Sequence, residues 1–377
     1  MNRIRSVVFI SNYLTPHQSA LSDALWKITE GNYTFIETIP IEKKTQELGK
    51  MPENRPYVLT YSTNKDVASA LIRNGDIVIS GSAPEHLVRE RVKQGKLLFR
   101  YSERPLKKGL EIWKYPYRFL RWHWNNPFWK PIYMLCASAY TAQDYGKFGL
   151  FKNKTYKWGY FPETKEYPDL NERIERKETT EILWCGRFLE WKHPDDALTV
   201  AKWLKDEGYC FRMNFIGTGV LEEKMERLIQ EYGLEDCVAL LGKMTPEQVR
   251  KHMEHAGIYL FTSDRQEGWG AVLNESMNSG CAVIASHAIG SVPYLLEDGE
   301  NGMVYESGNV EMLYEKVKLL LERPAEQRRL GMTAYETIAN VWNAENAAKR
   351  FLALSEKLLN GERNTVQFES GPCSHAD

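Results

Sequence analysis

The chain has 377 residues, 43% hydrophobic and 26% charged, a composition typical of a globular protein large enough for two domains. No apolar run approaches the roughly 18 residues that span a bilayer, and the six scattered cysteines form no CxxC pair. Composition therefore argues against a membrane-spanning protein, a disulfide scaffold and a zinc module, and it favours a reduced, cytoplasmic setting. The net charge is −1, but the two halves of the chain differ in charge. Residues 1–160 have 25 Lys and Arg and 13 Asp and Glu, whereas residues 161–377 have 24 Lys and Arg and 37 Asp and Glu.

Short apolar runs mark the expected strands of the first half. The first apolar run, Val7–Ile10, follows two arginines and is too short for the apolar core of a signal peptide, so we expect a strand there. The expected strands of this half are Val7–Ser11, Asp76–Ser80, Leu97–Tyr101 and Met134–Ser138. The basic balance of this half suits nucleic acid, an anionic membrane or a phosphorylated ligand.

A basic and aromatic segment, RPLKKGLEIWKYPYRFLRWHWNNPFWKP, covers residues 104–131. Cations interleaved with Trp and Tyr suit the surface of an anionic membrane. An aromatic-rich pair of core helices is the second interpretation. Single-stranded nucleic acid is a third, which the acidic second half disfavours. The segment is therefore expected to make peripheral membrane contact, and no nucleic acid partner is expected.

In the second half, strands alternate with amphipathic segments, a pattern that favours parallel α/β sheets. The expected strands are Glu181–Cys185, Arg212–Ile216, Val238–Leu241, Ile258–Phe261 and Ala282–Ala285. The expected helices are Pro194–Glu207, Leu221–Tyr232, Pro246–His255 and Val310–Glu322.

The expected fold class is α/β, with two Rossmann-like doubly wound domains facing each other across a deep cleft. Residues 1–160 and 161–342 are expected to form the two domains, and a last helix is expected at 343–360. The polar tail, residues 361–377, is expected to be disordered.

Cations and glycines follow the first two strands of the second half. Arg187 and Lys192 lie in the loop after Gly186, where two cations suit a phosphate. The acids Asp195 and Asp196 resemble a metal-binding pair, yet acids at a helix N-terminus complement the helix dipole. We therefore expect no metal site there.

The next loop matches half of a dinucleotide fingerprint. Gly217-Thr218-Gly219 lacks the third glycine, and the following strand ends without the required acid. A nicotinamide site is therefore disfavoured, although an NAD-dependent oxidoreductase or epimerase remains an alternative. A loop that faces a nucleotide is still plausible.

The stretch DRQEGWGAVLNESMNSGCAVIAS, residues 264–286, carries two glutamates. Glu267 lies in a loop, and Glu275 lies about one turn into the helix that follows. Side chains of a helix lean toward its N-terminus, so Glu275 can reach the space that Glu267 lines. Gly268 and Gly270 leave backbone N–H groups free at a helix N-terminus, which suits an anion. Each glutamate alone suits a structural role, but this combination favours a binding site.

These motifs resemble those of family 4 retaining glycosyltransferases, which have the GT-B fold. The motifs are GRFLEWKHP, FIGTGVLEEKM, LGKMTPEQVRKHMEHAGIYLFTS, EGWGAVLNESMNSGCAVIAS and IGSVPYLLEDGENGMVYESGN, over about residues 181–310. The Glu-x7-Glu pair is the most diagnostic of them. The first half is similar to bacterial capsule and lipopolysaccharide transferases. The resemblance also implies that the last helix, residues 343–360, crosses back onto the first domain.

The resemblance implies a role for each residue. Arg187 and Lys192 would hold the donor's diphosphate, and Glu267 would contact the donor sugar near the reacting carbon. Glu275 would accept hydrogen bonds from the ribose. The other implied donor-binding residues are Gly186, Gly217, Gly219, Lys243, Met244, Gly268, Trp269, Gly270, Ala271 and Val272. The family usually needs no metal, so the expected cofactor set is empty apart from the nucleotide sugar.

The first half departs from the family pattern where the acceptor would bind. His17 stands in the first loop, and Glu103 and Arg104 follow a middle strand where many members have histidine. These three residues are the acceptor-side candidates. The expected function is transfer of a sugar, preferably from a UDP-sugar, to a lipid-linked saccharide, in the cytoplasm or on the inner face of the plasma membrane. A nucleotide- or sugar-binding protein without turnover is the other alternative.

Overall fold

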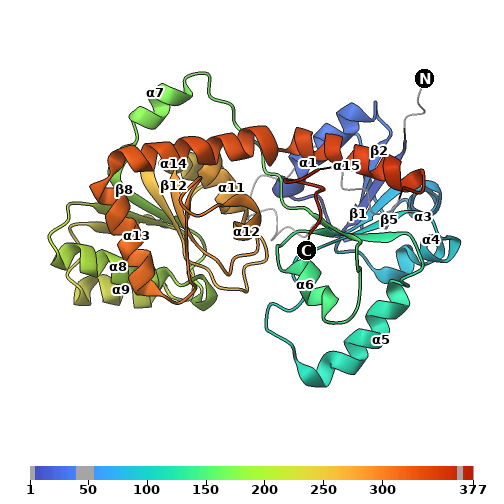
Figure 1. The fold of residues 1–377 in the computed structure, drawn as a ribbon, viewed down its shortest axis with the longest axis horizontal. Helices are drawn as coiled ribbons and strands as arrows, with labels where there is room; N and C mark the ends of the chain where they lie inside the picture. Colours follow the sequence, from blue (N-terminus) through green and yellow to red (C-terminus); the bar gives the residue numbers. More distant parts are fainter. Residues whose placement is uncertain (1–4, 40–54, 363–367, 377) are drawn as a thin grey trace. The chain divides into compact units, whose positions relative to one another are not determined.

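The computed structural model describes residues 5–39, 55–362 and 368–376. The chain forms two compact units (Figure 1), of which unit 1 is Met1–Glu163 with Val341–Asp377 and unit 2 is Thr164–Asn340. The junction that we predicted between residues 160 and 161 falls just before this division. Unit 1 is therefore built from two stretches of chain, with unit 2 inserted between them.

In the described part of unit 1, a seven-stranded parallel sheet has the order β3-β2-β1-β4-β5-β6-β7. Its central strands are buried along their whole length, as expected for runs such as VVFIS and IVIS in a sheet covered on both faces. The bounds are β1 Val7–Ser11, β2 Tyr33–Glu37, β3 Val58–Thr60, β4 Ile77–Ser80, β5 Leu98–Ser102, β6 Ile132–Cys136 and β7 Thr155–Lys157.

The helices of unit 1 come from both stretches of the chain. Their bounds are α1 Pro16–Ile28, α3 Lys65–Asn74, η1 Glu85–Leu87, α4 Arg89–Gln94, η2 Ile112–Lys114, α5 Tyr115–Asn125, α6 Thr141–Gly146 and α15 Ala344–Leu359. The late helix α15 lies beside α1 (Figure 1), and its Phe351 ring lies 4.9 Å from the ring of Phe99 on β5. Helix α15 therefore completes the core of unit 1.

The expectation of a disordered tail is wrong for residues 368–376. Cys373, Ser374 and Ala376 are buried, and His375 forms an antiparallel bridge with Tyr156 of β7. The amide of Ala376 donates to the carbonyl of Thr155 at 3.1 Å. Strand β7 is the edge of the sheet, and an edge strand presents unpaired backbone groups. The tail satisfies these groups despite its polar composition; its residues 363–367 and 377 lie outside the described residues.

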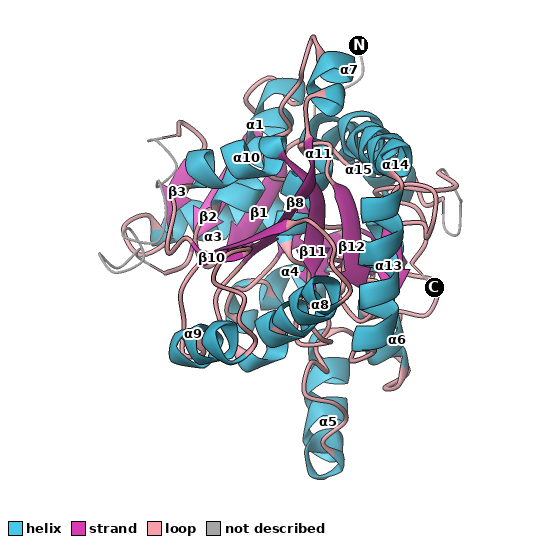
Figure 2. Ribbon diagram, turned by 90° about the vertical axis from the view of Figure 1, so that its left-hand side faces the viewer, coloured by secondary structure: helices cyan, strands magenta, loops and turns pink. Residues whose placement is uncertain are grey.

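In unit 2, a parallel sheet has the order β10-β9-β8-β11-β12-β13. Helices cover both faces (Figure 2), with α8, α9 and α13 grouped together and α10, α11 and α14 forming the other group. The strands are β8 Glu178–Cys185, β9 Arg212–Ile216, β10 Val238–Leu240, β11 Ala256–Phe261, β12 Ala282–Ser286 and β13 Met303–Tyr305. The helices are α7 Leu170–Glu175, η3 Glu190–Lys192, α8 Pro194–Asp206, α9 Glu222–Glu231, α10 Pro246–His255, α11 Ala271–Asn278, α12 Val292–Leu295, α13 Val310–Glu322 and α14 Pro324–Glu336.

Each sheet reverses its strand order at one point. In unit 1 the order turns between β1 and β4, and in unit 2 it turns between β8 and β11. In open parallel sheets, ligands bind beyond the carboxyl ends of the strands at such a switch point. Each unit thus has one favoured position for a ligand site. Among the described helices, none is both long and apolar enough to cross a bilayer.

Candidate active site

The switch point of unit 2 brings Lys192 and Glu267 together. Lys192 ends η3 in the loop after β8, and Glu267 lies in the loop after the neighbouring strand β11. Lys192 Nζ lies 2.5 Å from Glu267 Oε2, which also accepts a hydrogen bond from Ser263 Oγ at 3.2 Å. Both charged side chains are only 12% and 13% exposed. Lys192 and Glu267 are 75 positions apart in the sequence, and they form an ion pair because strands β8 and β11 are neighbours in the sheet.

Buried hydrogen bonds hold the two loops against each other. Thr262 Oγ1 donates to the carbonyl of Lys192 at 2.6 Å and accepts from the indole N–H of Trp184 at 2.9 Å. The amide of Asp264 donates to the carbonyl of Trp191 at 2.9 Å. Sequence analysis singled out neither Thr262 nor Trp184, because nothing in the sequence shows that the ends of β8 and β11 are adjacent.

Gly270 places the N-terminus of α11 beside Glu267. Its φ of +84° lies in the left-handed region, and a Cβ there would lie 2.3 Å from Phe261 Cζ and 3.2 Å from Glu267 Cγ. Only glycine fits this close approach. The N-terminus of α11, where backbone N–H groups suit an anion, then lies beside Glu267.

Trp269 differs from the other residues of this loop, because its side chain is a core residue. It is fully buried, and its indole N–H donates to Asn274 Oδ1 at 2.9 Å. Its carbonyl accepts a hydrogen bond from Ser291 Oγ at 2.6 Å. The indole therefore supports the loop, and the predicted contact of Trp269 with the donor cannot come from an exposed side chain.

Glu275 lies on the second turn of α11. Burial raises the pKa of its carboxyl group, and the nearby charge of Arg250 opposes that rise. Within the described part of the chain, no hydrogen bond of this carboxylate is found. Burial raises the pKa of the Tyr259 hydroxyl, and the negative charges of Glu275 and Glu267 raise it further. A desolvated carboxylate of this kind gains from a hydroxyl donor supplied by a ligand.

The glycines of the half fingerprint have a structural reason of their own. A Cβ on Gly217 would lie 1.9 Å from the carbonyl oxygen of Gly186, and one on Gly219 would lie 2.4 Å from that of Phe188. The loops after β8 and β9 therefore touch through their backbones. Neither glycine is evidence for a dinucleotide, because the packing of the two loops already requires both.

The other predicted donor-binding residues differ in exposure. Arg187 and Lys243 are exposed, while Met244 and Val272 are half-buried and Gly268 and Ala271 are buried. Of the two cations predicted to hold a diphosphate, the structure brings only Lys192 against Glu267. Arg187 stays on the surface of the same loop.

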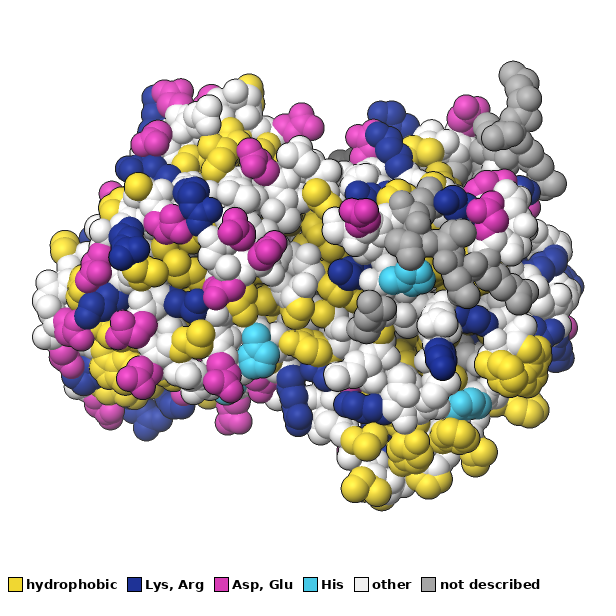
Figure 3. Space-filling model, in the orientation of Figure 1, with side chains coloured by type: hydrophobic (Ala, Val, Ile, Leu, Met, Phe, Trp, Pro, Cys, Tyr) yellow, Lys and Arg dark blue, Asp and Glu magenta, His cyan; other side chains and the backbone are white. Residues whose placement is uncertain are grey.

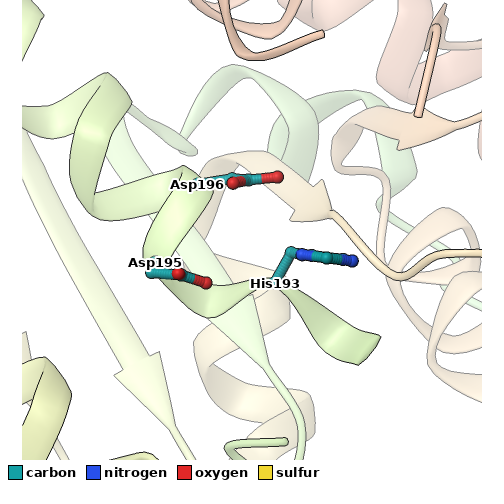
Figure 4. Close-up of side chains that lie close together, drawn as sticks. All are labelled: His193, Asp195 and Asp196. Atoms are coloured by element: carbon teal, nitrogen blue, oxygen red, sulfur yellow. The ribbon is translucent and has the colours of Figure 1, made fainter. Parts of the chain in front are cut away.

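His193, Asp195 and Asp196 gather at the start of α8 (Figure 4), with one potential ligand atom each within 4.8 Å of the others. Asp195 is paired with Lys224 at 2.7 Å, and His193 Nε2 lies 3.5 Å from Asp264 Oδ2. Burial raises the pKa of the Asp196 carboxyl group. Asp195 and His193 thus have partners within the protein, and acids are favourable at a helix N-terminus. That no metal binds here stays a prediction.

The switch point of unit 1 holds a polar cavity of about 450 Å³. Its walls come from the ends of β1, β4 and β5, and they include all three acceptor-side candidates, His17, Glu103 and Arg104. Lys107 and Tyr160 also line the cavity, and sequence analysis did not single them out. The sequence therefore identified part of a real cavity from residues up to 87 positions apart.

Contacts inside this cavity fix its side chains. Glu103 accepts a hydrogen bond from Tyr160 at 2.5 Å and pairs with Lys107 at 2.5 Å. The His17 ring stacks on Tyr160, and burial lowers the pKa of its imidazole, which favours the neutral form. Arg104 is tied to the fully buried Asp144 at 3.2 Å. The cavity thus offers aromatic surface, a carboxylate and cations, a combination that suits a sugar with polar substituents.

Residues 168–337 match the family model described as glycosyl transferases group 1. The match fills almost all of unit 2 and contains both Lys192 and Glu267. A glycosyltransferase is therefore the enzyme class that this comparison supports.

Curated relatives are similar over part of the chain. The amylovoran biosynthesis glycosyltransferase AmsK of Erwinia amylovora is 28% identical over 182 residues, which are 47% of this chain and 44% of AmsK. A relative from Campylobacter jejuni is 32% identical over 141 residues, which are 37% of each protein. Its name is N-acetylgalactosamine-N,N'-diacetylbacillosaminyl-diphospho-undecaprenol 4-alpha-N-acetylgalactosaminyltransferase. The chain thus spans less than half the length of these relatives.

Solved structures are similar over nearly the whole chain. HepE of Anabaena in complex with UDP has a TM-score of 0.68 at 13% identity, with 93% of this chain and 100% of HepE covered. Sucrose-phosphate synthase of Thermosynechococcus elongatus has a TM-score of 0.66 at 15% identity, with 95% and 100% covered. At these identities the likeness shows the fold, and the predicted GT-B fold of two parallel α/β domains is confirmed.

Proposed function

We propose that this protein is a retaining glycosyltransferase of family 4. It transfers a sugar from a nucleotide sugar, preferably a UDP-sugar, to a lipid-linked saccharide in the synthesis of a bacterial surface polysaccharide. The observation that carries this proposal is the half-buried Lys192–Glu267 pair, which lies at the switch point of unit 2.

The donor's diphosphate would be bound by cations and by backbone N–H groups. Lys192 and Arg187 supply the positive charge, and the first turn of α11 supplies the N–H groups. Negative charge builds up on the diphosphate as the bond to the sugar breaks, so groups fixed in place beforehand stabilise the transition state. In this proposal the reaction needs no divalent metal.

The two glutamates would hold the two ends of the donor. Glu267 is fixed by Lys192 and Ser263, so its carboxylate can face the sugar with little reorganisation. Glu275 has a desolvated carboxylate that gains from the ribose hydroxyls. A UDP-sugar is favoured because HepE was solved with UDP and with UDP-glucose, while GDP-mannose stays open as a donor.

The acceptor would bind in the cavity of unit 1, where His17, Glu103 and Arg104 meet. A lipid-linked acceptor is supported by the Campylobacter relative, whose name places its substrate on undecaprenol diphosphate. An acceptor anchored in this way would keep the enzyme in the cytoplasm, peripheral to the inner face of the plasma membrane.

The first test is nucleotide release from UDP-, GDP- and ADP-sugars, with bacterial membrane lipid extract as acceptor and with or without EDTA. Release from one donor that EDTA does not affect supports the proposal and names the donor. Binding of one nucleotide without any transfer or hydrolysis would instead favour a binding protein without turnover. Tight retention of NAD would favour the oxidoreductase alternative.

Substitutions at the ion pair test the site itself. Lys192→Ala and Glu267→Ala should each lower transfer by roughly 100-fold or more, the scale for losing one transition-state contact. Lys202→Ala is the matched control, because Lys202 is an exposed lysine on α8 that pairs with Asp206. Near-normal transfer in both site variants, with folding intact, would refute the assignment.

A further inference from the structure

Helix α5 is held to unit 1 along one side only. Tyr115 stacks on Phe148 with ring centroids 4.6 Å apart, and Trp122 lies 4.7 Å from Phe148 and 5.0 Å from Tyr145. No residue of α5 is buried, and the helix stands out from the rest of its unit (Figures 1 and 2). The remaining sides of α5 are therefore available to a partner.

Large exposed apolar side chains are concentrated on α5 and on the short segments directly before and after it. Of the twelve large hydrophobic side chains exposed in the described part of the chain, nine lie between residues 110 and 129. Six are between 66% and 79% exposed: Ile112, Trp113, Leu120, Trp124, Phe128 and Trp129. Figure 3 shows hydrophobic side chains gathered over α5. Single exposed apolar residues are ordinary, but a gathered set marks an interaction surface.

The spacing in the sequence explains this arrangement. Tyr117, Leu120 and Trp124 recur at intervals of three and four residues, so they share one stripe of α5. Trp113 lies in η2, directly before the helix. The stripe of Tyr115 and Trp122 faces the unit instead. The helix thus has two apolar stripes, and unit 1 covers only one of them.

The charge around this surface is almost entirely positive. Residues 104–131 contain seven Lys and Arg against one acid, Glu111. That carboxylate is already paired with Lys114 at 2.6 Å and with Arg118 at 2.7 Å. Arg121 is exposed, and its guanidinium lies 5.9 Å from the ring centroid of Tyr117; Lys108 is exposed two residues before the start of this segment. The surface therefore combines insertable aromatic side chains with a positive field.

We propose that this surface, residues 110–129, docks on an anionic lipid bilayer. Trp and Phe enter the interface between headgroups and acyl chains, and the neighbouring cations attract the anionic headgroups. A second copy of the chain is the weaker occupant, because a twofold contact would bring two positively charged surfaces together. The field that opposes self-association is the one that attracts an anionic membrane.

Docking would place the cavity of unit 1 beside the lipid. Arg100, which lines the cavity, donates to Asn126 Oδ1 at 2.8 Å and to the carbonyl of Asn125 at 3.1 Å, at the end of α5. Trp122 of α5 lines the same cavity. This step rests on the proposed function: a saccharide on a membrane lipid would reach the cavity without leaving the bilayer surface.

The test is sedimentation of the full chain with vesicles, without any sugar donor, so that it does not depend on transferase activity. Vesicles of phosphatidylcholine mixed with phosphatidylglycerol are compared with pure phosphatidylcholine at low and high salt. The wild type should sediment with the mixed vesicles and be released by salt. The double variant Trp113→Ser/Trp124→Ser should bind the mixed vesicles about 10-fold or more weakly, since each substitution removes a large apolar side chain that would otherwise be buried in the bilayer.

Two further variants separate the contributions. Lys108→Gln/Arg121→Gln should weaken binding to mixed vesicles by roughly 10-fold or more and reduce its salt dependence. Val67→Ser, on α3 of the same unit, removes an apolar side chain that is 56% exposed and should leave binding unchanged. Equal binding of the wild type and the double Trp variant would overturn the proposal. A concentration-dependent dimer that the Trp variant abolishes, without vesicle binding, would also overturn it.

Discussion

Replacing Gly270 by alanine tests whether the close approach at α11 is a steric requirement. Gly208, at the end of α8 in the same unit, is its matched control. The two glycines have almost the same φ, +84° and +83°, but a Cβ on Gly208 meets nothing within 4 Å. The Gly270 Cβ would lie 2.3 Å from Phe261 Cζ, and Phe261 is only 3% exposed.

The two substitutions should therefore differ in size. A non-glycine residue in the left-handed region costs roughly 1–2 kcal/mol, which both variants share. Forcing extra volume into a packed core costs about 1–3 kcal/mol more, which only Gly270→Ala incurs. For a domain of this size, 1 kcal/mol corresponds to about 2–4 °C in Tm. Gly270→Ala should thus melt roughly 2–12 °C below Gly208→Ala.

Thermal unfolding followed by circular dichroism measures the difference, and nucleotide binding below the melting range gives a second readout. Displacing the Phe261 ring or the loop also moves Glu267, whose Cγ lies 3.2 Å from the built Cβ. Gly270→Ala should therefore bind nucleotide more weakly, while Gly208→Ala binds normally. Equal Tm values for the two variants would show that the loop yields freely and that the steric argument is wrong.

Three further predictions follow from particular side chains. Glu275→Gln should raise Tm near neutral pH and weaken nucleotide binding. Burial raises the pKa of the Glu275 carboxyl group, so the folded state loses stability as pH rises through that pKa and the carboxyl group ionises. An unchanged Tm would contradict this. The pKa of His17 is lowered by burial from 6.5, so the unfolded chain binds the extra proton and stability should fall as pH drops below about 6.5; His17→Gln should flatten that part of the profile of Tm against pH. Deleting residues 368–376 should uncover the edge of β7 and increase light scattering on heating, whereas scattering like that of the full chain would show that the edge needs no cover.

Local signals in the sequence predicted several elements well. Helix α10 begins at Pro246 as expected, because Thr245 and Gln248 form a capping box around a proline in the first turn. Strands β1 and β9 also have the predicted bounds. The strand expected at Met134–Ser138 begins earlier, at Ile132, because the chain enters the sheet directly after Pro131.

Features that depend on distant partners were missed. The tail is polar, and its partner β7 lies about two hundred positions earlier, so composition alone indicated disorder. The close approach of Gly217 to the carbonyl of Gly186 is visible only in the fold, whereas its place near a nucleotide stays a prediction. The aromatic segment is predicted from its sequence to contact a membrane, with core helices as the second interpretation. In the structure one stripe of α5 packs against unit 1 and another is exposed, a division that depends on the fold.

The division of unit 1 into two stretches has a consequence for synthesis on the ribosome. Strands β1 to β7 emerge first, but the helix and tail that cover them follow only after the whole of unit 2. At about 5–20 residues per second, the stretch from residue 163 to residue 376 takes on the order of 10–40 s. Unit 2 is continuous and has its complete sequence earlier, so it can finish folding first. The nascent first unit is thus the part of the chain with the greatest need of chaperone protection.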